Sequence, residues 1–91
     1  MRLKLQRELR KVLKDSKGHI KKNLKKLINE LKTNPYPPDF DIKKIKGYAS
    51  KEDIFLRARI GPYRVFYAYN KTKKEITILE TKHRSKAYKQ L

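Results

Sequence analysis

Apolar and polar residues alternate with period two from Ile54 to Tyr69, on either side of a break at Gly61 and Pro62. Alternation with period two predicts two β-strands, and the Gly-Pro pair predicts a tight turn between them, because glycine tolerates unusual dihedral angles and proline fixes one. The apolar face of this hairpin consists of Ile54, Leu56, Ala58, Ile60, Tyr63, Val65, Tyr67 and Tyr69. The other face consists of Phe55, Arg57, Arg59, Arg64, Phe66 and Ala68. For any single arginine, exposure to solvent is as good an explanation as a function. Three arginines on one patch of sheet, however, favour a functional surface.

The segment from Ile20 to Leu31 has the clearest helical pattern. Its apolar residues recur at helical spacing and form one stripe: Ile20, Leu24, Leu27, Ile28 and Leu31. Most of the remaining surface is lysine: Lys21, Lys22, Lys25, Lys26 and Lys32. An ordinary solvated helix face explains these lysines better than a nucleic-acid-binding face, and both interpretations stay open. Asn34 and Pro35 end the helix.

The N-terminal segment predicts a short strand followed by a short helix. Met1 to Gln6 alternates, and from there the spacing of Leu9, Val12 and Leu13 is helical. One continuous helix from residue 3 is the alternative. The run Asp15-Ser16-Lys17-Gly18 predicts a break between the two helices and an N-cap for the second.

The other segments complete an α+β domain that spans residues 1–91. Three prolines within 35–41 predict a loop, and the basic run 42–47 is assigned to no element. Glu75 to Thr81 predicts a third strand, with Ile76 and Ile78 on one face and Leu79 on the other. Residues 82–88 are predicted to leave the sheet edge as a basic tail. The expected fold is therefore a short N-terminal strand and two helices packed on a mostly antiparallel sheet with a C-terminal three-stranded meander.

The formal net charge of +17 changes the functional expectation. Such a charge on a small domain indicates a polyanionic partner such as RNA, DNA, the ribosome or an acidic protein, with a membrane surface as the weaker alternative. No apolar run is long enough to span a bilayer. The chain has no cysteine, which excludes disulfides and zinc–thiolate sites and is compatible with a cytoplasmic location.

Candidate chemistry centres on arginines and tyrosines, and no cofactor is expected. The only histidines, His19 and His83, have no His or carboxylate at ligand spacing, so no metal site is predicted. RNA can be cut without a metal when its 2′-OH attacks the adjacent phosphate, provided that side chains move the protons and stabilise the charge on phosphorus. Arginine suits the last task, because its planar fork donates two hydrogen bonds to phosphate oxygens. Tyr88, close to Arg84 and Lys86, could move a proton if these cations lower its pKa, or could stack on a base.

The segment from Leu56 to Tyr67, with Lys44-Ile-Lys-Gly before it and His83-Arg-Ser-Lys-Ala-Tyr88 after it, resembles the RelE-type toxins of bacterial and archaeal toxin–antitoxin pairs. The archaeal members are the most similar, and the resemblance covers nearly the whole chain. Its Arg-x-Gly-x-Tyr-Arg-x-x-Tyr run is fairly specific to the RelE/ParE superfamily but does not separate the branches within it. For RelE-like toxins the resemblance implies cleavage of mRNA in the ribosomal A site, and an acidic RelB-like antitoxin that wraps the toxin.

The resemblance also implies roles for particular residues. Arg64 takes the place of the phosphate-stabilising arginine, Arg84 that of the arginine after the last strand (Lys82 in a gapless match to some bacterial members), and Tyr88 that of the tyrosine proposed as acid or base. Phe55 stands where some members have a lysine, so one candidate proton acceptor is missing. Residues expected to bind RNA are Arg57, Arg59, Lys82, His83, Lys86, Lys44 and Lys46. The alternative functions are a gyrase-poisoning, non-nuclease toxin of the ParE type and a plain basic RNA-binding module.

Overall fold

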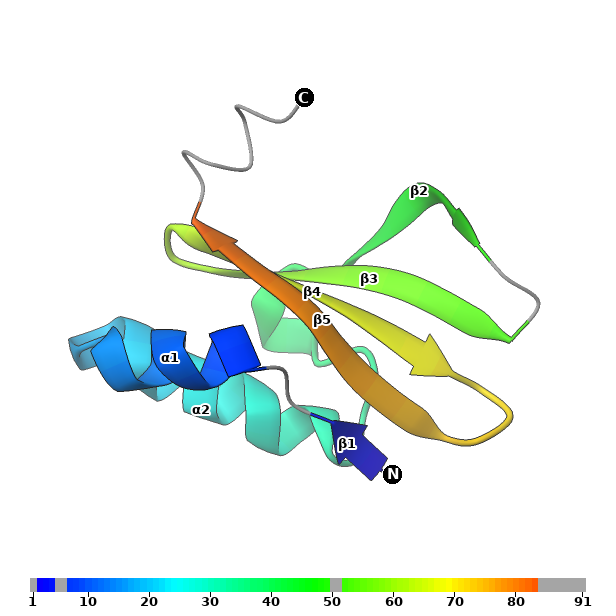
Figure 1. Cartoon of the computed structure of the whole chain (residues 1–91), viewed down its shortest axis with the longest axis horizontal. Helices are drawn as coiled ribbons and strands as arrows, with labels where there is room; N and C mark the ends of the chain where they lie inside the picture. Colours follow the sequence, from blue (N-terminus) through cyan, green and yellow to red (C-terminus); the bar gives the residue numbers. More distant parts are fainter. Residues whose placement is uncertain (1, 5–6, 50–51, 84–91) are drawn as a thin grey trace.

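The computed structural model describes residues 2–4, 7–49 and 52–83. The fold is α+β, with two helices on a five-stranded sheet (Figure 1). The elements in chain order are β1 (Arg2–Lys4), α1 (Arg7–Asp15), α2 (Gly18–Leu31), a 3₁₀ turn η1 (Pro38–Phe40), β2 (Lys43–Ala49), β3 (Asp53–Ile60), β4 (Tyr63–Asn70) and β5 (Glu75–His83). The predicted order of strand, two helices and antiparallel meander is confirmed, and the alternative of one continuous N-terminal helix is wrong.

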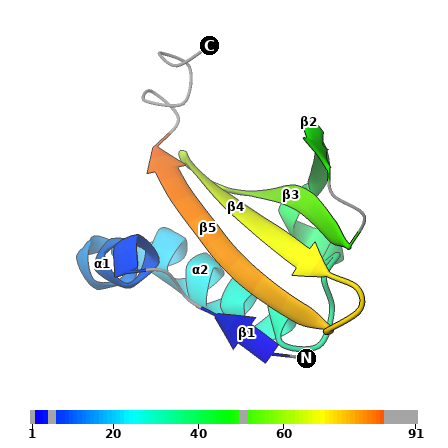
Figure 2. The ribbon, with the colours of Figure 1, turned by 45° about the vertical axis from the view of Figure 1, so that its right-hand side comes forward.

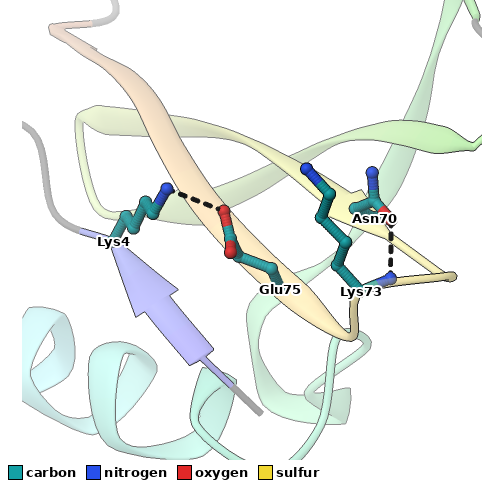
Figure 3. A network of polar contacts seen from close by, with 4 residues as sticks. All are labelled: Lys4, Asn70, Lys73 and Glu75. Carbon is teal, nitrogen blue, oxygen red and sulfur yellow. Dashed lines mark hydrogen bonds and ion pairs between the residues drawn. The ribbon is translucent and has the colours of Figure 1, made fainter.

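The strands lie in the order β1-β5-β4-β3-β2, so the first strand of the chain pairs with the last. This pair is parallel, with Leu3 opposite Ile76, whereas all other pairs are antiparallel. Next to it, the Lys4 Nζ lies 3.1 Å from a carboxylate oxygen of Glu75 (Figure 3). The Asn70 side chain closes the turn into β5 by accepting a 2.9 Å hydrogen bond from the Lys73 backbone N–H.

Both helices cover the same face of the sheet (Figure 2). The core lies between the helices and the sheet, and it contains the predicted apolar stripe of α2 and the predicted apolar face of the hairpin. Its buried members are Leu9, Leu24, Leu27, Leu31, Phe40, Leu56, Ala58, Ile60, Val65, Tyr67, Ile76 and Ile78. At the hairpin turn, Gly61 has a φ of +53°, a left-handed conformation that favours glycine. The period-two pattern therefore predicted correctly which face of β3 and β4 is buried.

Among the buried core residues that the structure describes, Tyr67 has a polar end that must find a partner. Its side chain is fully buried, and its hydroxyl donates a 2.7 Å hydrogen bond to the Pro35 carbonyl in the loop after α2. Burial raises the pKa of this hydroxyl well above its usual value, because the charged phenolate would lose its water. Tyr67 thus fastens the proline-containing loop to the centre of the sheet.

Tyr67→Phe tests this link, because it keeps the ring and removes only the hydroxyl. The Pro35 carbonyl would lose its donor, so we expect unfolding to require about 1–2 kcal/mol less. Below pH 10, the usual tyrosine value, the proton is held in both folded and unfolded chains. At higher pH the unfolded chain releases it first, so the parent should lose stability there relative to Tyr67→Phe. Chemical denaturation at about pH 8 and about pH 11 measures both effects. If the parent and Tyr67→Phe had equal free energies of unfolding at both pH values, the hydrogen bond from Tyr67 to Pro35 would be contradicted.

Two further expectations about the chain are corrected by the structure. The segment 42–47 is not irregular, because Lys43 to Ala49 forms the edge strand β2, so the meander has four strands. Lysines interrupt its apolar pattern, as is common on edge strands, where charge discourages pairing with other chains. The predicted N-cap of α2 is also wrong: Lys17 occupies the cap position without a side-chain hydrogen bond. The predicted break between the helices is confirmed: α1 ends at Asp15, and Gly18 has a φ of +62° at the start of α2.

The end of the sheet departs from the predicted basic tail. Lys82 and His83 still belong to β5, which continues past residue 81. A register shift makes this possible: Tyr67 pairs with Ile78 but Phe66 pairs with Glu80, so Leu79 is an extra residue. Beyond this bulge the buried position is Thr81, and Glu80 and Lys82 turn to the face that the helices leave open. The loop prediction for 36–41 is likewise refined, because it contains η1 and the buried Phe40.

Candidate nucleic-acid interface

The face of the sheet opposite the helices carries a row of three cations. Arg59 of β3 pairs with Arg64 of β4, and Arg64 pairs with Lys82 of β5. Residues directly opposite each other on antiparallel strands place their side chains on the same face, with Cβ atoms about 5 Å apart. We call Arg59, Arg64 and Lys82 the basic row. The sequence analysis had already placed Arg59 and Arg64 on one face of the hairpin, and the structure adds Lys82 beside them.

Like charges in direct register destabilise a sheet. One contact offsets part of this cost, since the Lys82 Nζ lies 3.3 Å from a carboxylate oxygen of Glu80 on the same strand. Arg59 is exposed, and Arg64 is half-buried. A row of cations in direct register on one face of a sheet is the arrangement expected where a polyanion binds.

A second row lies beside the basic row, one step further from the hairpin turn. Arg57 is its centre, with Lys43 of β2 on one side, Phe66 of β4 on the other, and Glu80 beyond Phe66. The Arg57 side chain is only 14% exposed, and its Nη2 lies 3.6 Å from a carboxylate oxygen of Asp41. Arg57 and Arg59 were predicted to share one role, but their surroundings differ. Arg57 is covered and ion-paired, whereas Arg59 is exposed.

Two of the predicted RNA-binding residues lie apart from these rows. Lys44 pairs with Leu56, so it belongs to the helix side of the edge strand and not to the arginine side. His83 pairs with Tyr63, and the two rings make an edge-to-face contact with centroids 5.3 Å apart. Lys46 belongs to β2, but its side chain lies outside the described part of the structure, as do Arg84, Lys86 and Tyr88 entirely.

Sequence reasoning missed Lys43 and Asp41. Lys43 lies opposite Arg57 only because 43–49 is a strand, and the sequence pattern did not show this strand. Asp41 reaches Arg57 because it follows η1 in a left-handed conformation with a φ of 46°. A signal for Asp41 did exist, since an aspartate after a proline-rich turn readily adopts this conformation.

Comparison with known proteins decides the family. The family model described as ParE toxin of the type II toxin–antitoxin system parDE matches residues 2–88. The chain belongs to the RelE/ParE family of type II toxins. RelE1 of Methanocaldococcus jannaschii is 44% identical to this toxin over 84 residues, which are 88% of the present chain and 89% of RelE1.

Two solved complexes contain a chain of the same fold. The RelE–RelB complex of Pyrococcus horikoshii OT3 matches with a TM-score of 0.78 and 31% identity, over 91% of the toxin and 93% of the matched chain. The RelB–RelE antitoxin–toxin complex of Methanococcus jannaschii matches with a TM-score of 0.75 and 31% identity, over 97% of the present chain and 98% of the matched chain. The resemblance inferred from the Arg-x-Gly-x-Tyr-Arg-x-x-Tyr run is thereby confirmed.

Two features are absent from residues 2–4, 7–49 and 52–83 of this toxin, a membrane-spanning helix and a metal-binding cluster. Neither of its helices is long and apolar enough to cross a membrane. Within the same ranges, no three His, Asp or Glu side chains gather in a way that could hold a metal ion.

Proposed function

We propose that this toxin is an endoribonuclease that cleaves mRNA in the A site of the ribosome and so stops translation in the cytoplasm. The observation that carries the proposal is the basic row, in which Arg64 is flanked in register by Arg59 and Lys82. A single phosphate lying over Arg64 would meet cations from three adjacent strands. Family membership supports the same function, because relatives in solved structures are named RelE.

The proposed reaction is attack of a ribose 2′-OH on the neighbouring phosphate, followed by departure of the 5′-oxygen. Arg64 stabilises the negative charge that develops on the phosphate oxygens, as a preorganised double donor. Arg57, Arg59 and Lys82 hold the message in place through its phosphates. By resemblance to the family, Arg84 assists in charge stabilisation and Tyr88 transfers a proton. This route requires only side chains and no cofactor.

The test of the proposed function is primer extension on a message under translation, with and without the toxin. Cleavage that appears only on translated message, at positions that follow the reading frame, is the expected result. Cuts that are independent of translation would indicate a general RNA-binding nuclease. Intact message would contradict the proposal.

The ParE description of the matching family model supports one alternative, a toxin that poisons DNA gyrase without cutting RNA. A supercoiling assay with purified gyrase separates the two functions. Loss of supercoiling together with intact message would replace the nuclease by this alternative. Loss of message together with normal supercoiling would exclude it.

Binding to ribosomes or RNA should depend steeply on salt. The net charge of +17 and the basic row imply that phosphate contacts dominate the affinity. Each neutralised phosphate releases a condensed cation, so the logarithm of affinity falls linearly with the logarithm of salt concentration. For six or more contacts we expect a loss of about a thousandfold between 50 and 200 mM salt. Filter binding across a salt series measures the slope, and an affinity that stays flat would contradict phosphate-dominated binding.

An acidic antitoxin should stabilise the toxin strongly. The two solved relatives are complexes with RelB. In the present chain β2 pairs with β3 only as far as Arg57, which leaves the end of β3 without a neighbouring strand on that side, beside a pocket of about 180 Å³. This edge is a natural place for a disordered chain that folds on binding. Co-expression with the neighbouring open reading frame should yield a complex with a melting temperature well above that of the free toxin. An unchanged melting temperature would count against it.

A further inference from the structure

Arg57 is largely buried, but its hydrogen-bond donors do not all have an acceptor. Its side chain is only 14% exposed, and its Nε and Nη2 have no hydrogen-bond partner among the described residues. The Asp41 carboxylate is 3.6 Å from Nη2, which is within ion-pair range but too long for a hydrogen bond. Buried donors without acceptors destabilise a fold, so each such group requires an explanation.

The position of Asp41 suggests what the missing acceptor is. Asp41 follows η1 at a φ of 46°, a conformation that few residues other than Gly, Asn and Asp adopt readily. Its carboxylate is 51% exposed, so water reaches the anion from the side away from Arg57. The chain therefore presents a solvated carboxylate to a covered guanidinium without completing the paired hydrogen bonds that arginine normally makes with an anion.

We propose that Asp41 occupies the place of an RNA phosphate on Arg57 and competes with it in the free toxin. When RNA binds, a phosphate displaces the loose contact with Asp41 and accepts the unused donors of Arg57. This assignment rests on the proposed function, since the ligand is RNA, and it adds a competing carboxylate to the contact between Arg57 and RNA. Asp41 is thus an internal competitor that lowers RNA affinity.

The surroundings of Arg57 favour a phosphate as the displacing group. Lys43 lies directly opposite Arg57 in register and supplies a second cation, while Phe66 on the other side offers an aromatic ring next to the same position. A phosphate carries more acceptor oxygens than a carboxylate and matches the guanidinium fork. An acidic peptide could use the same cations, and the test separates the two ligands.

Asp39 provides a matched control for Asp41. Both aspartates belong to the turn 38–41, both are more than half exposed, and each forms one ion pair, Asp39 with Lys26 at 3.0 Å. Asp41→Asn and Asp39→Asn change the net charge equally, but only the first releases Arg57. Asparagine also adopts the left-handed conformation of position 41 readily, so the backbone is preserved; Asp41→Gly serves as a second variant for the same reason.

The experiment measures binding of a fluorescent single-stranded RNA whose 2′-hydroxyls are methylated, so that it cannot be cut. Fluorescence anisotropy should show about threefold to fivefold tighter binding for Asp41→Asn, the gain expected from removing a competing ion pair. Asp39→Asn should bind less than about 1.5-fold tighter, because this exposed carboxylate pairs with Lys26 and not with Arg57. In an Arg57→Lys background the extra gain of Asp41→Asn should disappear, because the fork that Asp41 occupies is gone.

Equal gains for the two variants, or a gain that persists with Arg57→Lys, would overturn the proposal. Tighter binding of an acidic peptide with unchanged RNA affinity would assign the site to a protein partner instead. Absence of RNA binding in all variants would also overturn it. Failure of the nuclease function is recognised separately, since primer extension would show intact message even if Asp41→Asn binds the methylated RNA more tightly.

Discussion

Arg64→Ala is expected to slow cleavage of message by roughly a hundredfold in single turnovers on saturated ribosomes, as removal of one preorganised charge-stabilising donor commonly does. Arg64 is central in the basic row, between Arg59 and Lys82, so a phosphate above it is stabilised mainly by this guanidinium. The effect should fall on the rate and not on binding, because the two neighbouring cations remain.

Three comparisons make this expectation specific. Arg64→Lys keeps the charge but removes the planar fork, so it should recover only part of the rate. Lys73→Ala removes the same charge from the turn at the other end of β4, about 20 Å away, and should cleave like the parent. Arg59→Ala should weaken binding and be rescued by more toxin or less salt. An Arg64→Ala toxin that is rescued in the same way would show that Arg64 only binds.

Leu27→Ala should reduce the free energy of unfolding by about 3 kcal/mol. Leu27 is fully buried in the middle of α2, where it packs in the core between this helix and the sheet. Its replacement removes apolar contacts and leaves a cavity that a small domain cannot easily close. Because domains of this size are stabilised by only about 5–15 kcal/mol, the free toxin should unfold at a much lower urea concentration.

Lys25→Ala is the control for Leu27→Ala on the same helix. Lys25 is exposed, and alanine has a slightly higher helix propensity, so the urea midpoint should stay within experimental error or rise. Equal losses for the two variants would mean that α2 contributes through its surface and not through the core. Measurements are made on the toxin without its antitoxin, since a bound partner would mask the loss.

The sequence predicted the structural features that depend on local patterns. It did not predict those that depend on pairing between distant segments. Alternation placed the buried face of β3 and β4 correctly, because Gly61 and Pro62 fix the turn and thereby the register of Ile60 opposite Tyr63. Strand β2 was missed because lysines interrupt its apolar positions and its pairing depends on β3, not on its own propensity. The continuation of β5 was missed because a bulge at Leu79 exchanges the faces.

The same distinction applies to the candidate site. Selecting Arg57, Arg59 and Arg64 required only the face of one hairpin. Placing Lys82 beside Arg64 required the register of β5, and separating Arg57 from Arg59 required the path of the chain at Asp41. Tertiary contacts of this kind leave no periodic trace in the sequence, so Arg57 and Arg59 were given the same role although their surroundings differ.

Pairing of the first strand with the last has a consequence for the synthesis of this toxin. Strand β1 cannot take its place until β5 has emerged, and β5 also brings Lys82 to the basic row. Contacts between the ends of a chain form late, because loop closure over so many residues is entropically costly. A nascent chain therefore lacks a complete basic row until β5 has emerged from the ribosome that makes it.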